Sequence, residues 1–381
     1  MTPAFSAYLN GLRFMAALVV LVGHWSYRMP EWSITRWIYV HDIARDAVIV
    51  FFVMSGLVIA YSTERKSKFG LGRFAADRCG RLWSVAIPAM VLTIGIDSVF
   101  HWLGTTNVPL GPSDAAGWAS MSAIALAFFN QLWWLNLDIA SNTPWWSLGY
   151  EAWYYAIFAA WFFLRGRARL YSTVGLSLIA GPKILLLAPA WVAGVYVWHL
   201  ISTGQHRRLE QRSALVGIIA TALIYGVAQG FALPSLMSSA TEATLGVEAY
   251  QMLARSGPFV WLNILGALTA FHILCVASVC ADDRSKDGLL RRTTHWFADA
   301  TFSLYLVHMP VMWLVGALLP AETHILTRAA ALLLIPFAAS LAFAEVFERN
   351  DWGLRAMLRR LMVFPVRLIQ RLRSGILPFP Q

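Results

Sequence analysis

Charged side chains are scarce in this chain of 381 residues: Asp, Glu, Lys and Arg together make up 13% of it, whereas hydrophobic residues make up 58%. A soluble domain carries roughly twice that share of charge. The composition therefore excludes a soluble globular protein and predicts a polytopic, all-α integral membrane protein. Cysteine is also rare, and the spacing of Cys79, Cys275 and Cys280 indicates no disulfide framework.

Apolar segments bounded by charged residues mark the expected membrane spans. About ten transmembrane helices are predicted, at residues 12–29, 46–63, 82–104, 145–164, 170–182, 185–202, 213–233, 258–281, 297–320 and 325–346. The fifth and sixth are short and are separated by Gly181-Pro182-Lys183, which favours a tight hairpin. We interpret the apolar stretch 117–137 as re-entrant or interfacial, because a full span there would invert the topology of everything that follows.

Acidic residues are fewer than basic ones, 20 against 30, and the formal net charge is +10. In a soluble protein this excess would suggest a nucleic-acid partner. Here 23 of the 30 basic residues fall in segments expected on one side of the membrane: 64–81, 165–169, 203–212, 282–296 and the C-terminal tail. By the positive-inside rule both termini are expected in the cytoplasm, and no nucleic-acid partner is expected. The predicted domains are a transmembrane domain, residues 1–347, and a basic amphipathic cytoplasmic tail, residues 348–381.

Polar residues inside apolar spans are costly and are seldom kept without a partner or a task. Arg13 and His24 lie eleven residues apart in the first span. On a helix this separation is about three turns and about 16 Å, so both side chains share one face. The alternatives are that Arg13 reaches the inner headgroups and that His24 makes a contact within the helix bundle. No two His or Cys residues have a metal-ligand spacing, so no metal is expected.

Arg78 and Arg81, in the segment GLGRFAADRCGRLW, fall on the apolar side of the expected helix with Leu71 and Phe74. Two arginines three residues apart form a fork suited to phosphates or carboxylates. The alternative is ordinary anchoring at the cytoplasmic surface, which explains Arg73, on the other side of the helix. It explains the fork less well, because solvated anchors avoid an apolar face.

Two later spans carry further polar faces. In NTPWWSLGYEAWYYAIF, Ser147 and Glu151 share a face with tyrosines, and the carboxylate needs a partner such as an arginine or a histidine. The alternative for this carboxylate is a buried structural ion pair. In ATFSLYLVHMP, Thr301, Tyr305 and His308 share a face, which places a second histidine within the membrane. The alternative for that histidine is a satisfied residue of the core.

Five motifs occur in order between residue 9 and about residue 313: LNGLRFMAALVVLVGH, VIVFFVMSGLVIA, DRCGRLWSVAIP, TPWWSLGYEAWYY and TFSLYLVHMPV. Each is weak alone. Together and in this order they resemble the acyltransferase-3 family of integral membrane O-acyltransferases, which modify surface polysaccharides, lipid-linked sugars and some antibiotics. The first motif contains Arg13 and His24, and the third contains Arg78 and Arg81.

The resemblance implies an acyl-CoA-dependent O-acyltransferase that lies in the lipid bilayer of a bacterial cytoplasmic (inner) membrane. The donor would be cytoplasmic acyl-CoA, with acetyl-CoA expected, and Arg13, Arg78 and Arg81 would hold its phosphates. The acceptor would be a hydroxyl of a cell-surface saccharide or of a lipid-linked sugar. His24 would be the catalytic residue.

We expect His24 to deprotonate the acceptor hydroxyl, because an imidazole titrates near neutral pH. Glu151 would orient or stabilise that imidazole, as a carboxylate does in a catalytic triad. Equally open is a covalent route in which His24 accepts the acyl group first. The residues expected to line the substrate channel are Trp146, Ser147, Tyr305 and His308.

The competing interpretation is a secondary transporter or flippase of a saccharide or an anionic small molecule, since polar residues inside spans also mark permeation routes. Transporters usually show paired repeats with broken helices in both halves. This sequence has one hairpin broken by Pro and Gly, near residues 181–189, and no counterpart of it elsewhere. The pattern therefore favours the enzyme.

Overall fold

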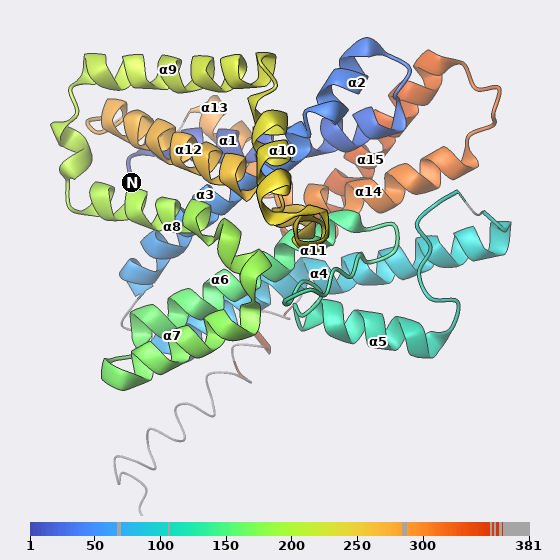
Figure 1. Cartoon of the computed structure of the whole chain (residues 1–381), viewed down its shortest axis with the longest axis horizontal. Coiled ribbons are helices and arrows are strands. Elements are labelled where there is room, and N and C mark those ends of the chain that lie inside the picture. Colours follow the sequence, from blue (N-terminus) through green and yellow to red (C-terminus); the bar gives the residue numbers. More distant parts are fainter. Residues whose placement is uncertain are drawn as a thin grey trace, which may run out of the picture.

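A computed structural model describes residues 1–66, 70–105, 107–283 and 288–350, with the single positions 353, 356, 357 and 360. Within these residues the chain is helical and contains no β-strand, which confirms the predicted all-α class (Figure 1). The helices are α1 (Pro3–Arg28), α2 (Ser33–Val40), α3 (Ile43–Lys66), α4 (Gly70–Leu103), α5 (Ala115–Leu126), η2 (Thr143–Trp145), α6 (Trp146–Phe163), α7 (Gly166–Ala180), α8 (Pro182–Ser202), η3 (Gln205–Arg208), α9 (Gln211–Gly230), α10 (Leu233–Leu245), α11 (Val247–Met252), η4 (Ala254–Ser256), α12 (Phe259–Val279), α13 (Leu289–Ala298), α14 (Thr301–Leu318) and α15 (Ile325–Phe347).

Eight helices in the described ranges are long and apolar enough to cross a membrane: α1, α3, α4, α8, α9, α12, α14 and α15. The other two expected spans also form helices, α6 and α7, but do not meet these criteria. Helix α7 has 15 residues, fewer than the ~20 that a bilayer requires. Helix α6 has 18 residues, and its tryptophans, tyrosines and Glu151 lower its hydropathy. The expected turn between α7 and α8 does form, with Gly181 at φ +82° and Pro182 opening α8.

The stretch 117–137 does not form a full span. Helix α5 has 12 residues and so extends about 18 Å, well short of the ~30 Å hydrocarbon core. The chain then turns back through irregular structure that leads into η2, with positive φ at Phe128, Trp133 and Ala140. This geometry agrees with the re-entrant or interfacial interpretation.

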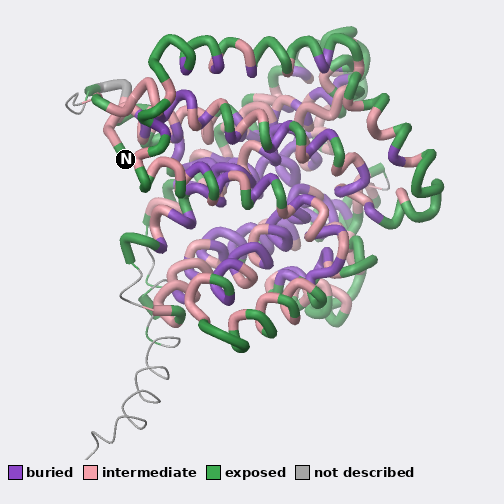
Figure 2. The backbone as a smooth tube through the Cα atoms, turned by 60° about the vertical axis from the view of Figure 1, so that its left-hand side comes forward, coloured by how far each residue is buried: buried purple, intermediate pink, exposed green. Residues whose placement is uncertain are grey.

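Helices α3 and α8 approach each other closely at two glycines. A Cβ atom on Gly56 would lie 2.0 Å from the carbonyl oxygen of Trp191, and one on Gly194 would lie 1.8 Å from that of Val53. Small residues permit such backbone contact between membrane helices. Helix α3 is mostly buried, whereas the outlying α9 is mostly exposed (Figure 2).

Helices α1 and α14 lie side by side and run in the same direction. The ring of Phe14 lies 4.4 Å from that of Phe297, just before α14, and the ring of Tyr27 lies 6.5 Å from that of Trp313. Residues spaced along α1 therefore meet residues at matching heights on α14. This pairing sets the relative heights of the polar side chains on α1 and α14.

The predicted amphipathic tail, residues 348–381, lies outside the described residues beyond Asn350, apart from four single positions. Its start is described. Glu348 follows α15 directly and accepts hydrogen bonds from the backbone N–H groups of Phe302 and Ser303, at 3.4 and 2.7 Å. The cytoplasmic location of both termini stays a prediction.

Candidate functional site

Three adjoining chambers follow one another along α1 and α14. The basic chamber, about 740 Å³, is lined by Arg13, Arg81, Val85, Arg291, Arg292, His295, Trp296, Asp299, Phe302, Glu348 and Arg349. The inner chamber, about 130 Å³, shares Arg13, Arg81 and Phe302 with it and adds Arg78, Ser147, Glu151, Tyr155 and Tyr305, among others. The histidine chamber, about 530 Å³, shares Val48 and Tyr305 with the inner chamber and contains His24 and Trp146.

The structure brings together the three arginines that the sequence singles out. Arg13 from α1 and Arg78 and Arg81 from α4 all line the inner chamber, and Arg13 and Arg81 also line the basic chamber. The Nε atom of Arg78 is buried and has no hydrogen-bond partner among the described residues. The cluster is a concentration of positive charge with capacity for an anion.

Glu151 does not meet His24. Its carboxylate accepts a hydrogen bond from Ser55 Oγ on α3 at 2.7 Å, and it also accepts one from the hydroxyl of Tyr155, one turn further along α6. Helix α6 therefore presents Glu151 to α3 in the inner chamber, together with Arg13. The predicted contact between Glu151 and His24 is not formed, because this carboxylate lies at the arginine end of α1 rather than at the histidine end.

Ser147 and Tyr305 stand between the inner and the histidine chambers. The Tyr305 hydroxyl donates to the carbonyl oxygen of Pro144 at 2.9 Å, so it accepts the hydrogen bond from Ser147 Oγ at 2.7 Å. Both side chains are buried. Trp146, the neighbour of Ser147 at the start of α6, lines the histidine chamber instead. Of the four expected channel residues, Ser147 lines the inner chamber, Trp146 the histidine chamber and Tyr305 both, whereas His308 lines none of the three.

His24 is paired with His308. The two rings meet Nδ1 to Nε2 at 2.9 Å, and His308 Nδ1 lies 2.7 Å from the carbonyl oxygen of Leu304. A carbonyl only accepts, so Nδ1 of a neutral His308 carries its proton and Nε2 is an acceptor. His24 Nδ1 must then be the donor, which leaves the lone pair of His24 on Nε2. His308 is fully buried, whereas His24 lines the chamber.

Asn142 is a structural residue that the sequence analysis did not single out. Its Nδ2 donates to the carbonyl oxygen of Leu306 at 2.9 Å and to Thr93 Oγ1 at 3.1 Å. The Leu306 carbonyl needs an outside donor because the residue four positions later, Pro310, has no N–H group. Asn142 thereby fixes the loop before α6 to the middle of α14. The proline inside an apolar helix is the sequence signal that could have predicted such a donor.

Arg255 was also missed. It lines the histidine chamber and forms an ion pair with Asp138 at 3.1 Å. The two residues belong to loops that are distant in sequence, so no spacing rule connects them. Among the described residues, no group of three or more His, Cys, Asp or Glu side chains is arranged to hold a metal ion.

A helical bundle with an arginine cluster and a histidine pair inside it defines a multi-pass membrane protein with an internal polar site. The family model that describes an acyltransferase domain, acyltransferase-3, matches residues 6–345. The chain therefore belongs to the acyltransferase-3 family and is a membrane acyltransferase, as its five motifs indicate. No curated protein and no solved structure matches it significantly.

Proposed function

We propose that this protein transfers an acyl group, expected to be acetyl, from cytoplasmic acyl-CoA to a hydroxyl of a cell-surface saccharide or lipid-linked sugar. The membrane would be a bacterial cytoplasmic (inner) membrane. The observation that carries the proposal is the row of adjoining chambers that runs from the arginine cluster to His24. The family assignment supports transfer of an acyl group over the transporter or flippase alternative.

The distance from Arg13 to His24 along the row of chambers matches the length of the pantetheine arm of acyl-CoA. Arg13 and His24 are about 16 Å apart along α1, from the helical rise per residue. The pantetheine arm has about 13 bonds between the diphosphate and the sulfur, which span ~15 Å if three extended bonds cover about 3.5 Å. A donor whose diphosphate contacts Arg13 and Arg81 would therefore present its thioester near His24. The inner chamber, at about 130 Å³, is the smallest of the three, so the nucleotide would stay in the basic chamber while the arm occupies the inner one.

In the direct mechanism, His24 Nε2 takes the proton of the acceptor hydroxyl while the hydroxyl oxygen attacks the thioester carbonyl carbon. The carbon–sulfur bond breaks, and the imidazolium returns the proton to the CoA thiolate. His308 acts as a positioning residue, because its Nε2 holds the His24 proton on Nδ1 and keeps the basic nitrogen facing the chamber. In the covalent alternative the same Nε2 attacks the thioester first.

Glu151 takes a role on the donor side in this proposal. Its hydrogen bonds to Ser55 and Tyr155 fix one wall of the inner chamber, and its negative charge faces the same space as Arg13 and Arg78. It would orient the arginines and the passing arm rather than the imidazole. Ser147 and Tyr305 would border the thioester where the two chambers adjoin.

The test uses the purified full-length protein in detergent with labelled acetyl-CoA. Wild type should release labelled acetate, and His24→Ala should lose about 10²- to 10⁴-fold of that rate, the usual contribution of a general base. The matched control is His272→Ala, which removes a membrane histidine bonded to Thr221 outside the three chambers. Turnover of no acyl-CoA by wild type, or full activity of His24→Ala, would overturn the proposal. Exchange of labelled CoA into acetyl-CoA without acceptor would distinguish the covalent route from the direct one.

A further inference from the structure

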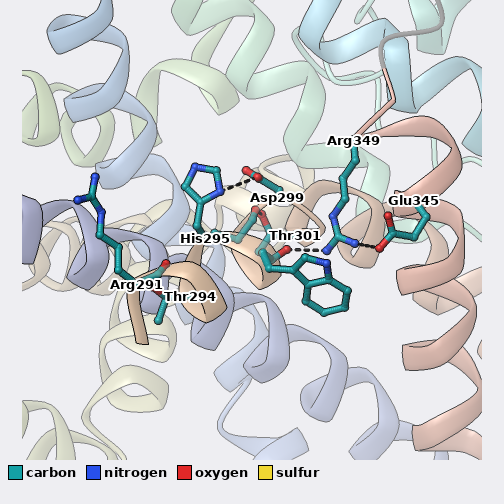
Figure 3. A network of polar contacts seen from close by, with 9 residues as sticks. Arg291, Thr294, His295, Asp299, Thr301, Glu345 and Arg349 are labelled. Carbon is teal, nitrogen blue, oxygen red and sulfur yellow. Dashed lines mark hydrogen bonds and ion pairs between the residues drawn. The ribbon is translucent and has the colours of Figure 1, made fainter. Parts of the chain in front are cut away.

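The basic chamber is far larger than a single phosphate requires. Its volume of about 740 Å³ lies within the range of pockets that hold whole small molecules. One wall is the short helix α13, which contributes Arg291, Arg292, His295 and Trp296. Figure 3 shows this helix beside the end of α15, with Arg349 reaching across to it. None of these residues belongs to the motifs that the sequence analysis assigned to the donor.

The charge in the chamber is predominantly positive, and its carboxylates have partners. Five arginines line it, against Asp299 and Glu348. Asp299 lies 2.8 Å from His295 Nδ1 (Figure 3). Glu348 accepts the backbone N–H of Ser303, and burial raises the pKa of this carboxyl although Arg13 opposes the shift. The chamber is therefore lined by more cationic than anionic side chains, which suits a ligand with more than one phosphate.

An aromatic platform lies in the same wall. The Trp296 side chain is 44% exposed, and the guanidinium carbon of Arg349 lies 3.9 Å from its ring centroid. Arg349 also donates to the Trp296 carbonyl oxygen at 2.6 Å. It pairs with Glu345 as well (Figure 3). The arginine is thus held by three contacts and keeps the indole in place. A fixed aromatic ring beside arginines is a common surface for a nucleobase.

We propose that the basic chamber binds the nucleotide end of acyl-CoA, with Arg291 and Arg292 contacting the 3′-phosphate and Trp296 packing against the adenine. The inference rests on the proposed function and extends it. Arg13 and Arg81, which line both chambers, hold the diphosphate, and the arm enters the inner chamber from there. Helix α13 is therefore the recognition element that distinguishes a full CoA ester from a simple thioester.

The test compares donors that lose the nucleotide in steps: acetyl-CoA, its 3′-dephospho form, and acetyl-pantetheine. In wild type the KM should rise at each step. In the double variant Arg291→Ala/Arg292→Ala, the KM for acetyl-CoA should rise roughly 10- to 100-fold, as expected for lost charge-assisted hydrogen bonds. The preference for acetyl-CoA over its 3′-dephospho form should disappear. Trp296→Leu should reduce the preference for the 3′-dephospho form over acetyl-pantetheine.

The control pair is Arg165→Ala/Arg167→Ala, two exposed arginines that line no chamber, whose KM values should stay at wild-type levels. Arg291→Lys/Arg292→Lys should recover part of the discrimination, which an unfolded variant could not do. Equal losses for all three donors, or equal losses in the control pair, would overturn the inference.

A second readout separates this inference from the proposed function. Adenosine 3′,5′-bisphosphate, which has no thioester, should bind wild type in calorimetry and bind Arg291→Ala/Arg292→Ala at least 10-fold more weakly. Binding that is equal in the two proteins would overturn the inference even if acetyl-CoA is turned over. Turnover of no acyl-CoA by wild type, with discriminating nucleotide binding intact, would overturn the proposed reaction and retain the nucleotide site.

Discussion

The Nδ1 atom of His24 and the Nε2 atom of His308 lie 2.9 Å apart, and the Leu304 carbonyl fixes the proton on the far side of His308. The three groups form a directional chain that ends at the lone pair of His24 Nε2. A carbonyl replaces the carboxylate that usually ends such a chain. The His24 imidazole is therefore oriented without a second buried charge, which a membrane interior would penalise.

His308→Ala should lower kcat about 10- to 10²-fold, because His24 can then adopt the tautomer that puts a proton on Nε2. The KM for acetyl-CoA should stay at the wild-type value, since His308 contacts no part of the donor site. His308→Gln should recover part of kcat, because a side-chain carbonyl can accept the Nδ1 proton. Steady-state kinetics of the three proteins checks this. Full activity of the alanine variant would show that the pair has no positioning role.

Arg81→Ala should raise the KM for acetyl-CoA roughly 10-fold or more, with a smaller change in kcat, because Arg81 lines both the basic and the inner chambers. Arg73→Ala is the matched control from the same helix. Arg73 pairs with Asp77 outside these chambers and should leave the KM unchanged. A donor affinity equal in both variants would contradict the phosphate assignment.

Asn142→Leu should lower the free energy of unfolding by about 1–3 kcal/mol, since it leaves the Leu306 carbonyl buried without a donor. Pro310→Ala restores a backbone N–H that can occupy the same carbonyl. In the double variant the loss from Asn142→Leu should therefore be smaller than in the wild-type background. Denaturation of wild type, the two single variants and the double variant in one detergent measures the coupling energy between Asn142 and Pro310. Purely additive losses would show that the Leu306 carbonyl is not the shared partner.

Gly194→Ala should destabilise the bundle by at least 1–3 kcal/mol, because its Cβ would overlap the Val53 carbonyl and force α3 and α8 apart. Gly95→Ala is the matched control within α4. It meets no atom within 4 Å and should be neutral or stabilising by up to about 1 kcal/mol, from helix propensity alone. Thermal unfolding of both variants checks the contrast. A stable Gly194→Ala would mean that the two helices can separate at little cost.

Local periodicity predicted which side chains share a face of one helix. It could not predict contacts between segments that are distant in sequence. Arg13 and His24 share a helix, so their common face followed from the 3.6-residue repeat. His308, by contrast, lies 284 residues from its partner, and no pattern in either span identifies which polar group it meets. Glu151 was assigned to the wrong partner for the same reason: its height relative to α1 depends on where α6 begins, at Trp146, and on how α6 packs on α3.

The prediction of membrane spans from hydropathy differed from the structure at two helices. Helices α6 and α7 were predicted as spans, and both form, yet neither is long and apolar enough to qualify. Aromatic residues with polar tips gave α6 an apolar appearance while they supply hydrogen bonds to the interior, as Tyr154 does to the Ile184 carbonyl at 2.8 Å. A helix that faces a polar site need not carry the composition of one that faces lipid.

The small size of the inner chamber has a consequence for the membrane itself. At about 130 Å³ it is the smallest of the three chambers, beside neighbours of about 740 and 530 Å³, and Phe51, Phe52, Leu82 and Phe302 help to line it. Under the proposed function, the acyl group on its pantetheine arm would occupy this chamber, and the nucleotide and the sugar would stay in the larger chambers on either side of it. With the arm in place, little room is left for water or ions. The bilayer that holds this protein would keep its electrical resistance while a covalent bond is exchanged across it.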